Sequence, residues 1–203
     1  MKRLSKIIFS FKAAKVFFTL EQNIRLVRKL KNIELSRISV SEFKSIAKTP
    51  VIIVLDNVRS LHNIGSIFRT ADAFVMEGIF LCGISACPPN PEIHKTALGS
   101  TESVHWQYFS DSMEAVKKLR GDGYTIVGIE QVEGSSSLEK MKFNKDLRYA
   151  FVLGNEVKGV DQTIINFCDF CIEIPQLGTK HSLNVSISGG VIMWEFFKQF
   201  HYE

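Results

Sequence analysis

The chain has 203 residues, of which 45% are apolar and 23% are charged, with a formal net charge of +4. This length and composition are typical of a globular protein with one ordinary domain, an appendage and a sizeable core. No apolar run approaches the roughly 18 residues that a membrane-spanning helix requires, which argues against a membrane protein.

Charge is concentrated near the N-terminus. Residues 1–48 contain 12 Lys and Arg against 3 Asp and Glu, whereas the remaining residues contain 13 against 18. A basic arm before a mildly acidic body is typical of a protein that binds a polyanion mainly through the arm. A solvated pair of amphipathic helices explains the same charges equally well.

The N-terminus begins with basic residues and then an apolar patch, as a signal peptide does. Lys12 and Lys15 interrupt the patch, however, and no small-x-small cleavage site follows it. We therefore expect a cytoplasmic protein, with an organelle transit peptide as the alternative.

The arm is predicted to be helical. Thr19 and Gln22 have the spacing of a capping box, which predicts a helix through about Lys31. A second short helix is expected after Ser41.

Strands and helices alternate after Thr49-Pro50, where we place the domain boundary because a residue before proline avoids helical geometry. We expect an extension at 1–48 and the main domain at 49–203. The predicted strands are Val51–Leu55, Gly78–Cys82, Val104–Phe109, Tyr124–Ile129, Tyr149–Leu153 and Phe170–Ile174. The predicted helices are Asn63–Phe74, Asp111–Arg120, Val160–Phe167 and Leu183–Phe200. Loops are predicted at Pro88–Pro91 and Gly134–Ser137. This order predicts an α/β fold, a parallel sheet with helices on both faces.

Three unusual segments follow predicted strands, namely Asp56–Asn63, Gly154–Glu156 and Pro175–Asn184. Ligands of parallel α/β sheets bind at the carboxyl ends of the strands. We therefore expect these segments to converge on a ligand site.

The first segment leads into a helix that Asn63 can cap and in which Gly65 allows a close approach. Arg69 lies six residues after Asn63, so the two side chains need not share a face. A guanidinium on this otherwise apolar helix needs an anion, supplied either by a structural ion pair or by a phosphate.

The second segment places Glu156 between Gly154 and Gly159. Its spacing fits neither the dinucleotide fingerprint nor the phosphate-binding Walker loop. The glutamate suits a cation, a ribose hydroxyl or a helix cap, and a simple turn is an equal alternative.

The third segment turns at Gly178 and opens the last helix with Ser182 or Asn184 at its cap. Gly189-Gly190 lies inside this helix, where each glycine costs about 1 kcal/mol relative to alanine. We infer that a close contact requires them.

Cys168 and Cys171 have zinc-ligand spacing, but no second pair of that kind exists. Cys82 and Cys171 fall in predicted buried strands, where cysteine acts as a small apolar side chain. We expect reduced thiols and no metal site.

Taken together, the three segments resemble the motifs of the SpoU, or TrmH-like, branch of the SPOUT methyltransferases. The family motif N-x-G-x-x-x-R-T-A matches Asn63, Gly65, Arg69, Thr70 and Ala71; L-G-x-E-x-x-G matches Leu153, Gly154, Glu156 and Gly159; and I-P-x-x-G-x-x-x-S-L-N-V-S matches Ile174, Pro175, Gly178, Ser182, Leu183, Asn184, Val185 and Ser186. The resemblance covers about residues 50–200, and the combination of motifs is specific although each motif alone is not.

The resemblance implies a parallel sheet whose C-terminal segment forms a deep trefoil knot. It also implies binding of S-adenosylmethionine in the knot loops, and a homodimer packed through the C-terminal and first-motif helices. The implied cofactor-binding residues are Leu153, Gly154, Gly159, Ile174, Gly178 and Leu183.

The implied reaction is methyl transfer to a ribose 2′-hydroxyl of RNA. Arg69 is the residue that the resemblance marks as essential, and we interpret it as a stabiliser of the forming alkoxide because arginine normally stays protonated. Asn63, Glu156, Ser182 and Asn184 complete the implied catalytic set. Glu156 also offsets the positive charge of the sulfonium donor.

Two features set this chain apart from the family pattern. Lys180-His181 stands where relatives often have small or apolar residues, so His181 is either an exposed loop residue, an RNA contact or an accessory base. The basic arm replaces a compact RNA-binding domain, which favours transfer RNA over ribosomal RNA.

The alternative function is a non-catalytic RNA-binding protein on the same scaffold. It would be indicated by the loss of Arg69, Glu156 or Asn184, and all three are present. A nucleotide-dependent oxidoreductase lacks its phosphate fingerprint, and a zinc-binding interaction module would rest on the cysteines alone.

Overall fold

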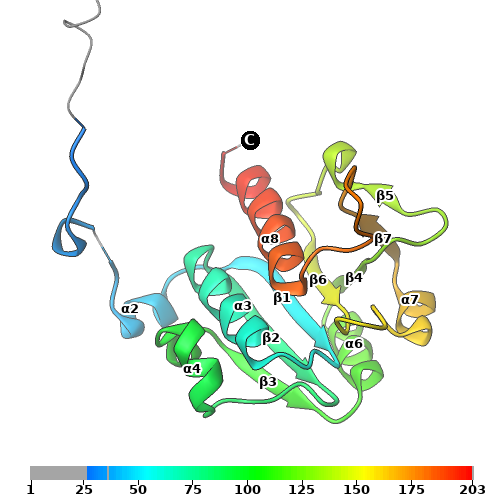
Figure 1. Cartoon of the computed structure of the whole chain (residues 1–203), viewed down its shortest axis with the longest axis horizontal. Helices are drawn as coiled ribbons and strands as arrows, with labels where there is room; N and C mark the ends of the chain where they lie inside the picture. The colour runs from blue at the N-terminus through cyan, green and yellow to red at the C-terminus, as the bar shows by residue number, and fades with distance from the viewer. Residues whose placement is uncertain (1–26, 36, 203) are drawn as a thin grey trace, which may run out of the picture. The chain divides into compact units, whose positions relative to one another are not determined.

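A sheet of seven parallel strands lies at the centre of the protein, in the order β3-β2-β1-β6-β4-β7-β5 (Figure 1). The computed structural model describes residues 27–35 and 37–202. The strands are β1 Thr49–Asp56, β2 Met76–Cys82, β3 Trp106–Phe109, β4 Tyr124–Ile129, β5 Ser136–Ser137, β6 Arg148–Leu153 and β7 Phe170–Glu173. The predicted parallel α/β sheet is therefore confirmed.

Helices cover both faces of this sheet (Figure 1). They are η1 Asn32–Glu34, α2 Val40–Ser45, α3 Leu61–Ala73, α4 Pro91–Ala97, α5 Ser100–Ser103, α6 Ser112–Gly121, η2 Leu138–Lys140, α7 Gln162–Phe167 and α8 Val185–Tyr202. Val51, Ile53 and Leu55 of β1 pack in one core with α3, α4 and α8, whereas Ile52 and Val54 pack in a second core with α6 and α7. Continuous apolar strands are expected when both faces of a sheet are covered.

Pro88–Asn90 is irregular, as the predicted proline loop requires, but two short helices that were not predicted follow from Pro91 onward. The side chain of Asn90 accepts a hydrogen bond from the backbone N–H of Glu92, and Pro91 stands in the first turn of α4. An N-cap followed by proline is a helix-start signal that the run of prolines obscured. The loop predicted at Gly134–Ser137 likewise ends in β5, which pairs with β7.

The helix predicted through Lys31 is wrong over its described part, because residues 27–31 are not helical. Arg28 forms an ion pair with Glu34 at 2.6 Å, and Glu34 also accepts the backbone N–H of Lys31 at 2.6 Å. These bonds hold the single turn η1. Thr19 and Gln22, the predicted capping box, lie outside the described residues.

By its contacts the chain divides into residues 1–38 and 39–203. The helix predicted after Ser41 is present as α2, but Ser39 caps it, with its side chain accepting the backbone N–H of Glu42. Phe43 of α2 is buried in the core that lies under α3. α2 therefore belongs to the second of these units.

The described residues contain no helix long and apolar enough to cross a membrane, and no group of three or more His, Cys, Asp or Glu that could hold a metal. Cys82 in β2 and Cys171 in β7 are buried, as predicted. Burial raises the pKa of the Cys168 thiol to about 12, so this thiol is protonated at neutral pH. The trefoil knot stays a prediction.

Candidate functional site

A pocket of about 700 Å³ opens at the carboxyl ends of β4, β6 and β7. The strand ends contribute Ile129, Leu153 and Ile174, and the start of α8 contributes Val185. This is the edge where a parallel sheet presents its loops, so the pocket lies at the edge where the ligand site is predicted. The described residues lining it include three glutamates, Glu130, Glu156 and Glu173, against one lysine, Lys158.

A tight loop closes one side of the pocket. The backbones of Asn155 and Gly159 exchange two hydrogen bonds, at 3.0 and 2.9 Å. A Cβ on Gly154 would collide with the backbone of Gly159 and Val160, so only glycine fits there. Gly159 has a φ of +71°, and Glu130 lies against its Cα. The two glycines thus fix the loop that presents Glu156.

Glu156 accepts three hydrogen bonds from the segment that enters α3. The donors are the backbone N–H groups of Arg59 and Ser60, both at 2.9 Å, and the side-chain amide of Asn63 at 3.0 Å. Burial favours the neutral acid, but these donors outweigh burial and lower the pKa of the Glu156 carboxyl. The carboxylate is therefore ionised at neutral pH and engaged in these three hydrogen bonds.

Asn63 does not cap its helix, contrary to prediction. Ser60 is the cap, and its side chain accepts the backbone N–H of Asn63 at 3.3 Å. The nearly buried side chain of Asn63 instead joins Glu156 to Asn184, which donates to the Asn63 oxygen at 3.1 Å. One chain of hydrogen bonds thus connects all three sequence motifs.

The predicted choice between Ser182 and Asn184 as the cap of α8 is settled by contacts. The side-chain oxygen of Asn184 accepts the backbone N–H of Ser186 at 2.8 Å and its hydroxyl at 2.6 Å. Ser182 is exposed and lines the pocket together with Leu183.

Arg69 lies outside this network. Its side chain is exposed, and within the described residues it makes neither a hydrogen bond nor an ion pair and does not line the pocket. The structural ion pair that we weighed for it is therefore absent from that part of the chain. The prediction that Arg69 and Asn63 need not share a face is confirmed, since Asn63 is buried.

Most predicted cofactor residues line the pocket: Leu153, Gly154, Gly159, Ile174 and Leu183. Gly178 is not among the described lining residues, and nothing stands within 4 Å of a Cβ placed on it. Glu130 was missed, although its place directly after β4 follows the rule that singled out the other segments. Its carboxylate accepts the backbone N–H groups of Gln131 at 3.0 Å and Val160 at 3.1 Å.

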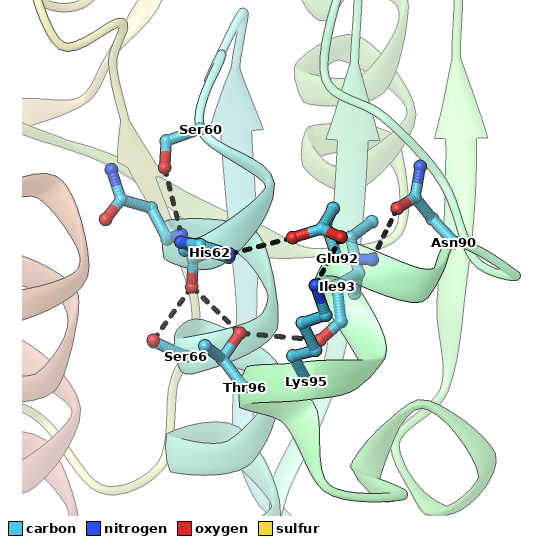
Figure 2. Close-up of polar contacts among 9 residues, drawn as sticks. Ser60, His62, Ser66, Asn90, Glu92, Ile93, Lys95 and Thr96 are labelled. Carbon is cyan, nitrogen blue, oxygen red and sulfur yellow. Dashed lines mark hydrogen bonds and ion pairs between the residues drawn. The ribbon is translucent and has the colours of Figure 1, made fainter.

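His62 and Glu92 face one another between α3 and α4 (Figure 2). Nε2 of His62 lies 3.2 Å from Oε2 of Glu92, and the other carboxylate oxygen accepts from Lys95 at 2.6 Å. The backbone oxygen of His62 accepts from Ser66 at 2.8 Å and from Thr96 at 3.1 Å (Figure 2). Hydrogen bonds from Lys95 and His62 lower the pKa of Glu92, so this carboxylate is ionised.

Glycines let neighbouring helices approach α3. A Cβ on Gly65 would collide with Thr96 and with the backbone of Ile93, so the predicted close approach is made by α4. A Cβ on Gly189 of α8 would lie 3.0 Å from Leu153 of β6 and 3.6 Å from Ile67 of α3. Gly190 has no such neighbour, because the nearest atom to its added Cβ, in Thr70, is 4.0 Å away.

An apolar stripe on α8 faces solvent. Leu183 precedes it, and Ile187, Val191 and Trp194 continue it with exposures of 55%, 36% and 47%. The spacing of three and four residues places these side chains on one face of the helix.

The fold and the site thus define an α/β protein with a pocket, lined by acidic residues, at the carboxyl edge of a parallel sheet. The chain belongs to the SpoU rRNA Methylase family, whose model matches residues 50–194. A Staphylococcus saprophyticus protein assigned to the TrmH tRNA/rRNA methyltransferases is 29% identical over 163 residues, covering 80% of this chain and 64% of the relative. This chain therefore spans less than two thirds of that relative's length.

Solved structures have the same fold. The SpoU methyltransferase AviRb from Streptomyces viridochromogenes, crystallised with AdoMet, is 25% identical with a TM-score of 0.66, covering 77% of this chain and 62% of AviRb. The TrmH/SpoU tRNA-modifying enzyme of A. aeolicus is 25% identical with a TM-score of 0.70, covering 79% of this chain and 80% of that enzyme.

Proposed function

We propose that this chain transfers a methyl group from S-adenosylmethionine to a ribose 2′-hydroxyl of RNA, with transfer RNA favoured over ribosomal RNA. The observation that carries the proposal is the chain of hydrogen bonds from Glu156 through Asn63 to Asn184 at the mouth of the pocket. It draws together residues from all three motifs of a family whose members methylate RNA.

The pocket fits a sulfonium methyl donor. Its volume of about 700 Å³ is in the range of sites for ligands of that size. Leu153, Ile172 and Ile174 supply apolar walls, and Glu130, Glu156 and Glu173 favour a cation. When bound, the donor supplies an electrophilic methyl group. The loops around Leu153–Gly159 and Ile174–Leu183, which we expect to form the trefoil knot, would hold it.

Arg69 is the residue that we assign to the forming alkoxide. Its guanidinium is exposed and free within the described residues, so an RNA phosphate and the ribose oxygen can be its anionic partners. Ser182, at the pocket, is proposed to position the ribose.

We further propose a cytoplasmic homodimer packed through α3 and α8. The exposed apolar stripe of α8 supports this, because solvent-facing Ile187 and Trp194 on one helix face are typical of an interface. Arg69 lies on α3, outside the lining of the pocket in its own chain, so a second copy is the proposed source of the guanidinium at each site.

The test is transfer of a labelled methyl group to total RNA, to transfer RNA and to ribosomal RNA, followed by nuclease digestion and mass spectrometry. We expect a 2′-O-methylated nucleotide, and no transfer when its 2′-hydroxyl is replaced by hydrogen. Arg69→Ala should lower the rate about 100-fold, the scale of removing one transition-state donor. RNA binding without transfer by folded protein would support the non-catalytic alternative.

A further inference from the structure

The proposed reaction needs a proton acceptor, since a ribose hydroxyl is hardly ionised at neutral pH. Arg69 stays protonated and cannot serve. Glu156 is engaged by three N–H donors that lower its pKa, and Glu130 is engaged by two. Carboxylates as a class are weak bases at neutral pH, whereas imidazole is the side chain best matched to neutral pH.

The choice therefore falls among the five histidines of the sequence, all of which are described. Neither His62 nor His94, His105 or His201 lines the pocket, but His62 differs from the other three in belonging to the segment that is bonded to Glu156. His181 lines the pocket, but within the described residues it bonds through its backbone oxygen alone, which accepts from Gln131 at 2.9 Å. Among the described residues, its ring therefore has no orienting partner.

His62 differs in having an ionised partner. A carboxylate only accepts hydrogen bonds, so the bond to Glu92 places the ring proton on Nε2 and leaves the lone pair on Nδ1. The side chain is 62% exposed, which leaves the ring accessible to RNA. Thr96 bonds the backbone of His62, and α4 packs on Gly65, so Glu92 is held in register with the ring (Figure 2).

The position of His62 also suits the reaction. It lies in the first turn of α3, between Ser60 and Asn63, which both bond Glu156 at the pocket mouth. In the proposed dimer, the guanidinium that serves this site is Arg69 of the second copy, so it would approach His62 across the interface.

The other charged groups on the elements packed around α3 have partners or positions away from the imidazole ring of His62, whose ionised partner is Glu92. Lys95 of α4 is bonded to the same carboxylate, and Glu102 of α5 lines a separate proline-rich pocket. Glu77 of β2 pairs with Arg148, and the charged residues of α8, Glu195 and Lys198, pair with each other.

We propose that His62, oriented by Glu92, is the proton acceptor for the ribose 2′-hydroxyl, an inference that rests on the proposed function. The hydroxyl proton passes to Nδ1 of His62, and the oxygen forms a bond to the methyl carbon. The carbon–sulfur bond breaks, and its electron pair stays on the sulfur. The proton then leaves the ring for water. Arg69 stabilises the negative charge on the oxygen during the step.

The test compares single-turnover methyl transfer across pH 5.5–9 for wild type, His62→Gln, His181→Gln and the matched control His94→Gln. We expect His62→Gln to lower the rate about 100-fold or more and to remove the rise of rate with pH, the scale of losing a general base. RNA and S-adenosylhomocysteine should bind His62→Gln within a few-fold of wild type. His94→Gln should retain the wild-type profile.

Glu92→Ala should lower the rate less than His62→Gln, and it should have no further effect in the His62→Gln background, because it acts through the ring. The proposal is overturned if His181→Gln, rather than His62→Gln, abolishes the rise with pH. It is also overturned if His62→Gln weakens RNA binding while the pH profile persists, since the ring would then be an RNA contact. Absence of transfer by wild type at every pH would instead reject the proposed function.

Discussion

Asn184 donates a hydrogen bond to the side-chain oxygen of Asn63 at 3.1 Å, across 121 positions of sequence. The direction of this bond is fixed at its far end, because the Glu156 carboxylate can only accept and so takes the amide of Asn63. The Asn184 oxygen is consequently left to cap α8 through Ser186. The pocket mouth therefore has a defined polarity of donors and acceptors.

This polarity predicts that Asn184→Asp is disruptive despite its similar shape. The variant would bring two acceptors together at Asn63, and turning Asn63 over would only move the conflict to Glu156. We expect a loss of about 1–2 kcal/mol in the free energy of unfolding, measured by urea denaturation. Asn166→Asp is the control, since within the described part of the chain the Asn166 side chain bonds through its oxygen alone, as acceptor from Gln162. Equal stability of the two variants would contradict the assigned polarity.

A second prediction concerns pH. The folded-state pKa of Glu156 is lowered, so its stabilisation is present above the unfolded value of 4.5 and is lost as pH falls through the folded pKa. Glu156→Gln should therefore melt about 2–4 °C below wild type at pH 7, equivalent to about 1 kcal/mol after allowance for solvent exposure. The difference should shrink below pH 4. Glu133→Gln, at an exposed turn, is the control, and a pH-independent difference would count against the bonding described for Glu156.

The four central strands β1, β2, β4 and β6 could be predicted because each is a largely apolar run that is buried on both faces. α4 was missed because the prolines before it indicate a loop and obscure its start at Asn90-Pro91, and α5 was missed because its four residues leave no periodicity to detect. Missing α4 also hides a contact beside the site, because α4 packs on Gly65 and carries Glu92, the partner of His62.

The edge of the sheet where the pocket lies was predicted, but the hydrogen bonds that connect its residues were not. Asn63 has the residue type of a cap, and only the presence of Ser60 three residues earlier takes that role from it. Its actual partners, Glu156 and Asn184, are 93 and 121 positions away, and no local pattern carries that information. Helical periodicity was enough to place Arg69 and Asn63 on different faces of the helix. Whether an acidic side chain pairs with Arg69 could be learned only from the three-dimensional structure.

A third prediction contrasts two glycines. Gly154→Ala should lower the free energy of unfolding by about 1–3 kcal/mol and weaken S-adenosylhomocysteine binding, because the added Cβ collides with backbone at Gly159. Gly121→Ala, at the end of α6 with nothing within 4 Å of its added Cβ, is the control and should neither lower the free energy of unfolding nor weaken S-adenosylhomocysteine binding. Calorimetry and thermal melting measure the two effects. Unchanged donor affinity in Gly154→Ala would exclude this loop from the donor site.

A fourth prediction concerns the basic arm. Because Phe43 is buried in the core, the deletion must stop at Ile38, removing 10 Lys and Arg and 2 Asp and Glu. We expect weaker RNA affinity and a shallower dependence of log Kd on log salt, since fewer counterions are released. S-adenosylhomocysteine affinity, measured in parallel by calorimetry, should stay within about two-fold. An unchanged salt slope would assign the arm a role other than RNA binding.

The last prediction tests whether each site needs two copies of the chain. Arg69 does not line the pocket of its own chain, whereas Asn184 does, so the two residues of one site would come from different copies. Arg69→Ala and Asn184→Ala should each lose methyl transfer as homodimers, by about 100-fold for Arg69. In a mixed dimer, purified with two different tags, one site would regain both residues, and the rate should recover toward half of wild type. If Arg69 instead serves its own chain, every site in the mixed dimer carries one defect and no recovery follows. Tagged mixed dimers of wild type with each variant give the rate expected when one chain carries a defect. Size-exclusion chromatography confirms that the variants still associate.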